Sequence, residues 1–148
     1  MTRTRIALIG CGRILQKHLD GIAENGEDAE IVAVCDLIES KAIAAAEKLG
    51  IPHYSDFDVM LREVPCDLVS VLTDSGSHAS ITIAVLKDHG LDVLVEKPMA
   101  ITLEDADAMI AAAKEAGRRL FVVKQNRFNP PIVKTREAKE AGRFGTMV

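Results

Sequence analysis

The chain has 148 residues, of which 48% are hydrophobic, so it is long enough for one domain with a sizeable core. Its formal net charge of −4 argues against a general nucleic-acid binder, and no apolar run approaches the roughly 18 residues of a membrane span. The three cysteines lack CxxC spacing, which argues against a disulfide framework or a metal site and fits the reducing cytoplasm.

The charge is unevenly distributed along the chain. Residues 117–148 carry eight Lys or Arg and two Asp or Glu, a net charge of +6, whereas residues 1–116 have a net charge of −10. The basic end fits two interpretations, a solvated polar helix or a surface that faces an anionic ligand.

Short apolar runs alternate with stretches of helical spacing. Strands are expected at 6–9, 30–35, 53–54, 68–72, 91–95 and 120–123. Helices are expected from about 14, at 38–49, 57–62, 80–89 and 102–117, and from 130 to about 141, with a further element beginning at 145–148. Asp56 and Thr102 are the expected N-caps of two of these helices. This alternation predicts an α/β fold with a doubly wound parallel sheet, as in a Rossmann domain.

A glycine-rich turn follows the first strand. Gly10 and Gly12 allow a tight turn and a close approach to a pyrophosphate, which the N-terminus of the following helix would attract. Arg13 adds a positive charge beside it. Leu15 replaces the third glycine of the usual GxGxxG pattern, which predicts a slightly displaced helix rather than a lost site.

Asp36 ends the second strand and fits two roles. A carboxylate at this spacing accepts hydrogen bonds from the adenosine ribose of a dinucleotide, and it also suits the N-cap of the next helix. The carboxylate would repel a 2′-phosphate, and no Arg follows at 37–40. NAD is therefore the expected cofactor, in preference to NADP.

Three further polar segments end strands at the edge where ligands of open α/β sheets bind. They are Glu96–Lys97–Pro98, the turn from Thr73 to His78, and residues 124–127. Each also has a simpler interpretation: a surface lysine, an ordinary turn with Ser77 as helix cap, and an exposed loop. The Lys97–Pro98 bond is a candidate cis peptide, because cis bonds are essentially confined to X-Pro.

Together these segments resemble the Gfo/Idh/MocA family of oxidoreductases. The resemblance rests on IALIGCGRI, AVCD, the turn at 73–78, VLVEKPMAIT and KQNRFNP, in the family's order and spacing. It implies an N-terminal Rossmann domain, here residues 1–127, followed by a linker helix and the start of a truncated second α/β domain at 128–148. The KQNR stretch most resembles members that oxidise C3 of a UDP-linked N-acetylhexosaminuronic acid.

The resemblance also assigns roles to residues. It implies that Gly10, Gly12, Arg13 and Ile14 bind the pyrophosphate and that Asp36 binds the adenosine ribose. It also implies further cofactor contacts by Thr73, Ser75, His78 and Gln125. Glu96 and Lys97 are placed at the nicotinamide ribose, and Asn126 and Arg127 at the substrate. Asp74 and Ser75 stand where the family has Pro and often Asn, so the contacts of this loop remain open.

The implied reaction is hydride transfer from a sugar carbon to nicotinamide, in which Lys97 orients the hydroxyl being oxidised. The base would come from the second domain, which also supports a homo-oligomer, and His18, His53 and His89 are expected to be structural. The alternative is a non-catalytic dinucleotide sensor of the same family. Lys97 discriminates between the two, because a sensor does not need it.

Overall fold

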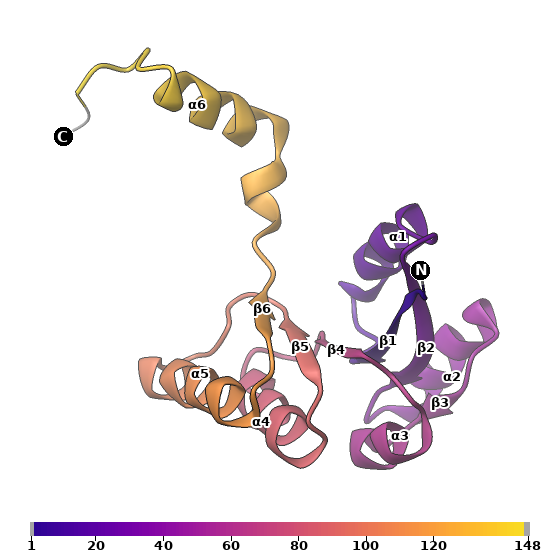
Figure 1. The fold of residues 1–148 in the computed structure, drawn as a ribbon. Coiled ribbons are helices and arrows are strands. Elements are labelled where there is room, and N and C mark those ends of the chain that lie inside the picture. The colour runs from indigo at the N-terminus through magenta and orange to yellow at the C-terminus, as the bar shows by residue number, and fades with distance from the viewer. Residues whose placement is uncertain (1, 147–148) are drawn as a thin grey trace.

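The computed structural model describes residues 2–146 and contains a six-stranded parallel sheet in the order β3-β2-β1-β4-β5-β6 (Figure 1). The strands are β1 (Thr4–Ile9), β2 (Ala29–Cys35), β3 (His53–Tyr54), β4 (Leu68–Val71), β5 (Asp92–Val95) and β6 (Leu120–Val122). The helices are α1 (Leu15–Glu24), α2 (Glu39–Leu49), α3 (Phe57–Glu63), α4 (His78–Asp88), α5 (Leu103–Ala116), the 3₁₀ helix η1 (Gln125–Phe128) and α6 (Pro130–Glu140). The expected doubly wound Rossmann architecture is confirmed.

Local sequence signals account for most helix boundaries. The Asp56 carboxylate accepts hydrogen bonds from the first turn of α3, and the Thr102 hydroxyl accepts one from the N–H of Asp105, so both expected caps are present. Gly50 and Gly117 end α2 and α5 in the left-handed conformation. The sequence did not predict η1, which lies in the polar segment interpreted as a binding edge or a loop.

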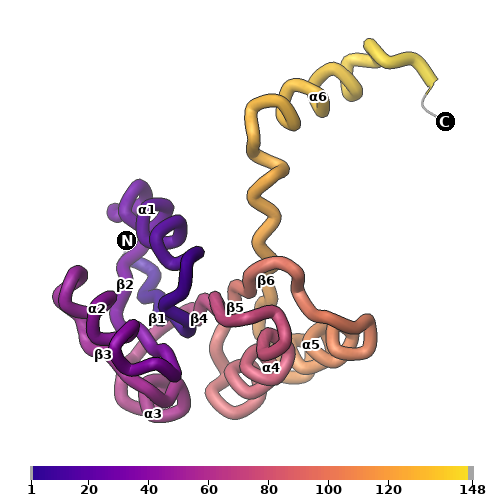
Figure 2. Tube along the Cα trace, turned by 180° about the vertical axis from the view of Figure 1, so that it is seen from behind, coloured from indigo at the N-terminus to yellow at the C-terminus, as the bar shows by residue number. Residues whose placement is uncertain are grey.

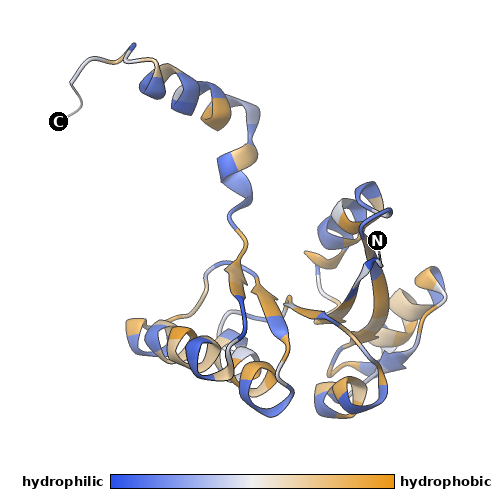
Figure 3. Cartoon of the chain, in the orientation of Figure 1, coloured by the Kyte–Doolittle hydropathy of each residue, from blue (hydrophilic) through white to orange (hydrophobic). Residues whose placement is uncertain are grey.

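Two apolar layers hold the sheet between helices. Leu15 and Leu19 of α1 pack with Ala45 and Ala46 of α2 against one face. The other face is covered by α3, α4 and α5 through buried side chains that include Met60, Val85, Leu86, Met109 and Ala112. Figure 3 shows the hydrophobic residues concentrated in the strands and alternating with polar residues along these helices. Leu15, at the position of the missing glycine, is part of this core.

The direction in which successive strands are added to the sheet reverses between the neighbouring strands β1 and β4. β1 pairs with β2 on one side and with β4 on the other, and all these pairs are parallel. The carboxyl ends of all six strands therefore lie at one edge, and the loops after β1 and β4 diverge there. This is where an open α/β sheet binds its ligands.

The C-terminal segment lies apart from the sheet. Figures 1 and 2 show η1 and α6 extending away from the body, and neither contains a buried residue. Phe128 and Ile132 are exposed apolar side chains of this segment. The element expected at 145–148 falls partly outside the described residues. None of the described helices is long and apolar enough to cross a membrane.

Candidate cofactor and substrate site

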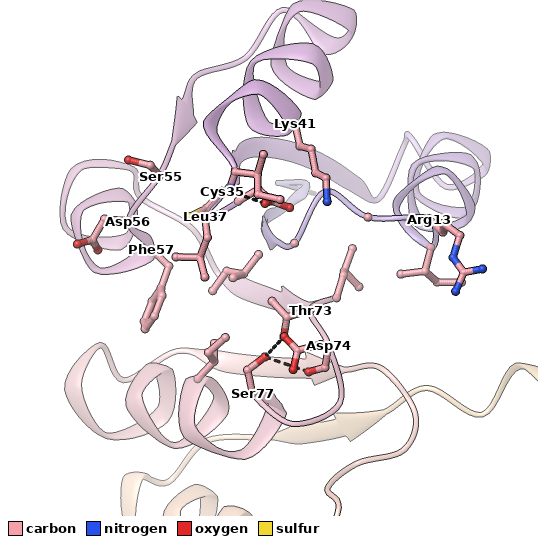
Figure 4. Close-up of a pocket in the computed structure, with 18 of the residues that line it drawn as sticks. Arg13, Cys35, Leu37, Lys41, Ser55, Asp56, Phe57, Thr73, Asp74 and Ser77 are labelled. Atoms are coloured by element: carbon pink, nitrogen blue, oxygen red, sulfur yellow. Dashed lines mark hydrogen bonds between the residues drawn. The ribbon is translucent and has the colours of Figure 1, made fainter.

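A cavity of about 840 Å³ opens at the carboxyl ends of β1, β2 and β4 (Figure 4). Six of the residues predicted to bind the cofactor line it, namely Gly10, Gly12, Arg13, Ile14, Asp36 and Thr73. They come from three separate chain segments, which the sheet brings to one place. The structure thus assembles the predicted pyrophosphate and ribose residues around a single cavity.

The two glycines of the turn serve different purposes. Gly10 has φ +103°, and a Cβ there would lie 2.8 Å from the carbonyl carbon of Leu72 and 2.9 Å from the nitrogen of Thr73. A Cβ at Gly12 would meet nothing within 4 Å. Gly10 is therefore needed by the fold, because the backbone after β4 passes so close to it. Gly12 faces open space in the cavity, where a ligand can approach the backbone.

The turn also presents unused hydrogen-bond donors. In the described chain, no hydrogen bond is made by the N–H groups of Gly12, Arg13 and Ile14, which precede α1. These donors and the positive end of the helix dipole are suited to an anion. The arrangement fits the pyrophosphate of a dinucleotide.

Hydrogen bonds to the backbone hold Asp36 in place. Its Oδ2 accepts from the N–H of Cys11 at 2.7 Å, and its Oδ1 accepts from the N–H of Ile38 at 2.8 Å. The carboxylate thus joins the glycine turn to the start of α2, and its remaining lone pairs are available to ribose hydroxyls. Burial, together with this nearby carboxylate, raises the pKa of the Cys11 thiol to about 11.

The cavity contains lining residues that the sequence did not single out. Leu37, which is 92% exposed, lines the cavity together with Ile38 and Phe57, so these three apolar side chains share the cavity with Asp36. Lys41 also lines the cavity, from the first turn of α2 (Figure 4). Helical geometry could have indicated Lys41, because one turn returns a side chain to the end of the preceding strand. Lys41 lies one residue beyond positions 37–40, which contain no arginine.

The turn after β4 differs in part from expectation. Ser77 occupies the N-cap position of α4, but its side chain makes no capping hydrogen bond. Its hydroxyl donates within the turn, lying 2.8 Å from Oγ1 of Thr73 and 2.9 Å from the carbonyl oxygen of Asp74. Thr73, Asp74 and Ser77 face the cavity, whereas Ser75 does not line it.

His78 has a different position from the one predicted. It was expected to line the cofactor, but its side chain is 0% exposed. Its Nδ1 lies 2.8 Å from the carbonyl oxygen of Pro98, and its Nε2 lies 3.1 Å from that of Thr73. The ring therefore packs beneath the loops after β4 and β5 and holds them together. Direct contact with a cofactor, as expected from the sequence, does not fit this burial. His78 instead joins two loops that carry other residues predicted to bind the cofactor.

A second cavity of about 570 Å³ lies at the ends of β5 and β6. Its lining includes the predicted residues Lys97, Gln125, Asn126 and Arg127, together with Lys124. The Lys97–Pro98 peptide bond is cis, as the sequence analysis suggested. Lys97 is exposed, so its ammonium group is available to a ligand.

Glu96 also differs from expectation. It was placed at the nicotinamide ribose, but it is only 6% exposed and lines neither cavity. Its Oε1 accepts a hydrogen bond from Nε2 of His18 at 2.9 Å, and its Oε2 accepts from the N–H of Lys97 at 3.0 Å. Both carboxylate oxygens are thus occupied by donors of the protein itself. The residue anchors the loop that carries Lys97 instead of facing the cavity.

The basic C-terminal segment divides into several environments. Lys124 and Arg127 line the second cavity, while Arg119 pairs with Asp92 and Lys134 pairs with Glu137. The basic residues behind the net charge of +6 at 117–148 therefore do not form one surface that faces a ligand. Among the described residues there is no cluster of His, Cys, Asp and Glu that could hold a metal ion.

Comparison with known proteins gives consistent matches. The family model GFO_IDH_MocA, described as an oxidoreductase family with an NAD-binding Rossmann fold, matches residues 4–124. The structure of the WlbA dehydrogenase from Bordetella pertussis, in complex with NADH and UDP-GlcNAcA, is 41% identical with a TM-score of 0.93, and the match covers 97% of this chain and 44% of that one.

Curated relatives include sugar dehydrogenases. The D-apiose dehydrogenase of Paraburkholderia graminis is 37% identical over 145 residues, which is 97% of this chain and 38% of that protein. The D-glucoside 3-dehydrogenase of Escherichia coli is 35% identical over 142 residues, 95% of this chain and 40% of that protein. The chain thus spans about two-fifths of the length of these relatives. The predicted family and its cofactor NAD are both confirmed: the chain belongs to the Gfo/Idh/MocA oxidoreductase family, with its NAD-binding Rossmann fold at residues 4–124.

Proposed function

We propose that this chain is the cofactor-binding part of an NAD-dependent dehydrogenase that oxidises a hydroxyl of an anionic, nucleotide-linked sugar. The observation that carries the proposal is the pair of cavities at the carboxyl edge of one sheet. The glycine turn and Asp36 line the first, and Lys97 lines the second together with Lys124 and Arg127. A site for the dinucleotide phosphates therefore shares one edge with a cationic site for a sugar.

Each residue has a defined role in this proposal. The N–H groups of the turn at 12–14 bind the pyrophosphate, Asp36 accepts hydrogen bonds from the ribose, and Leu37 with its apolar neighbours in the cavity packs against the adenine. When bound, NAD supplies the hydride acceptor. Lys97 donates a hydrogen bond to the substrate hydroxyl and orients its carbon, and a base outside residues 2–146 takes the proton. Lys97 favours this reaction over a sensor, which would bind the cofactor without needing it.

The anionic substrate is argued from charge. Arg127 and Lys124 stand beside Lys97, and a guanidinium group recognises a carboxylate or phosphate through two parallel hydrogen bonds. The relative from Bordetella pertussis was crystallised with a UDP-linked sugar acid, which carries both kinds of anion. We expect Asn126 and Arg127 to contact such a substrate.

Binding and turnover can be measured on one preparation of the chain. Calorimetry should show NADH binding, whereas NADH formation with candidate sugars should be absent, because the base is proposed to lie outside residues 2–146. Turnover at the rate of the complete gene product would show that the active site lies within these residues. Absence of NADH binding would refute the proposed pyrophosphate site.

The proposed substrate class is tested on the complete gene product. Its kcat/KM should be higher for UDP-linked hexuronic acids than for neutral hexoses or inositol, and Arg127→Ala should lower it for the acids. Arg143→Ala is a matched control, because this exposed arginine lies in the C-terminal segment and lines neither cavity. A strong preference for a neutral polyol would refute the anionic substrate.

A further inference from the structure

We infer that His18 is a positioning residue for Lys97 and acts on the nicotinamide end of the cofactor site through the buried carboxylate of Glu96. The inference rests on the proposed function, because it assumes that Lys97 contacts the nicotinamide half of NAD. It gives a role in cofactor binding to a histidine that the sequence alone predicts to be structural.

The contact joins two distant parts of the chain. His18 lies on α1, one turn after the helix begins, and Glu96 directly follows β5. Nε2 of His18 lies 2.9 Å from Oε1 of Glu96, and the two side chains are only 12% and 8% exposed. A carboxylate only accepts hydrogen bonds, so the ring nitrogen donates. In so buried a setting, loss of this donor leaves a carboxylate oxygen unsatisfied.

Glu96 transmits this constraint to the next residue. Its second oxygen accepts the N–H of Lys97 at 3.0 Å, and its own N–H donates to the carbonyl oxygen of Val71 at 3.0 Å. The peptide that precedes the Lys97 side chain is thus fixed to β4 and, through Glu96, to α1. On the other side of the loop, His78 contacts the carbonyl oxygen of Pro98 at 2.8 Å.

The geometry favours a role beyond general stability. α1 begins at the turn that is expected to bind the pyrophosphate, and the β5 loop carries the lysine expected at the nicotinamide. The hydrogen bond between His18 and Glu96 joins α1 to the loop after β5 and so sets the distance between the two ends of the dinucleotide site. Lys97 has a long, flexible side chain, so fixing its backbone reduces the entropy lost when its ammonium group binds a ligand.

Two ligands separate positioning from structure. NADH spans both ends of the proposed site, whereas ADP lacks both the nicotinamide and the ribose next to it, where Lys97 is expected to bind. Calorimetry on this chain should show His18→Leu weakening NADH binding by about five- to tenfold, the worth of one hydrogen bond, with ADP binding changed less than about twofold. His18→Gln keeps a donor at the end of the side chain and should restore most of the NADH affinity.

A double-mutant cycle tests whether His18 acts through Lys97. Lys97→Ala should weaken NADH binding at least as much as His18→Leu, and the double variant should lose no more than Lys97→Ala alone. Asp92→Asn is the matched control, because Asp92 pairs with Arg119 at the opposite end of β5. It should lower stability while leaving the affinities for both ligands unchanged.

Each outcome is decisive. Additive losses in the cycle, or equal weakening of NADH and ADP binding by His18→Leu, would overturn the inference and leave His18 as a structural residue. Equal affinity of the unmodified chain for NADH and ADP would also overturn it, since Lys97 would then make no contact with the nicotinamide half of NADH. Failure of the unmodified chain to bind either ligand would instead refute the proposed function itself.

Discussion

Gly10 and Gly12 are separated by one residue, and the structure predicts opposite consequences for replacing them with alanine. At Gly12, a Cβ meets no atom within 4 Å and φ is not positive, so the backbone accepts alanine without strain. The unfolded chain loses conformational freedom, and the free energy of unfolding should stay unchanged or rise by up to about 1 kcal/mol. The added methyl group nevertheless occupies the open space in which the pyrophosphate is proposed to lie.

The loss in binding follows from the donors of the turn. A methyl group between the phosphate and the backbone should prevent at least one charge-assisted hydrogen bond, which contributes about 1.5–3 kcal/mol. The Kd for NADH should therefore rise by about ten- to a hundredfold. Calorimetry measures this change, and urea unfolding of the same sample shows that Gly12→Ala remains folded.

Gly10→Ala is the complementary variant. Its Cβ would lie 2.8 Å from a backbone carbon of Leu72, at φ +103°, so both the contact and the dihedral angle are unfavourable. Left-handed strain and overpacking together should cost about 2–5 kcal/mol of unfolding free energy. The reasoning is refuted if Gly12→Ala binds NADH like the unmodified chain, or if Gly10→Ala is equally stable.

Further predictions concern selectivity and ionisation. Asp36→Ser should reduce the preference for NADH over NADPH by about 1–3 kcal/mol, whereas Lys41→Ala should increase it by removing a cation from the same cavity; titration with both cofactors measures the two ratios. Arg5 lowers the pKa of Asp67 to about 2, so this carboxylate stabilises the fold above pH 4, and that contribution disappears as the pH falls from about 4 to about 2; melting curves of Asp67→Asn should lack this step. Because the pKa of Cys11 is raised to about 11, iodoacetamide should alkylate it at pH 8 about a hundredfold more slowly than a free cysteine. Mass spectrometry of the modified peptide measures this rate, and a rate close to that of free cysteine would contradict the prediction.

The features that the sequence predicted depend on local or periodic signals. Apolar runs of four to six residues gave the strands, and Asp56 and Thr102 marked helix starts because a cap acts within one helical turn. The glycine turn and Asp36 could be predicted because the order of strands in a doubly wound sheet places the ends of the first two strands side by side. Where the local signal is weak, as in the polar residues at 125–128, the 3₁₀ helix was missed.

The features that the sequence did not predict depend on tertiary partners. Glu96 was expected at the nicotinamide ribose, on the open edge of the sheet, and charged side chains are seldom buried unless they are paired. Glu96 is buried because His18, 78 residues earlier, supplies the donor that permits it. His78 is likewise buried between two carbonyl oxygens that come together only when the loops after β4 and β5 are in place.

These errors follow a common pattern. At the carboxyl edge of the sheet, Glu96 and His78 are paired within the protein, are buried, and tie one loop to another. The groups that keep free donors or acceptors, such as the turn at 12–14 and Lys97, are those that line the cavities. Sequence motifs record both kinds of residue alike, because fixing a loop and contacting a ligand both require polar atoms next to strand ends. Burial together with pairing separates them: Glu96 is paired and buried, whereas Lys97, next to it in the same motif, is exposed at a cavity.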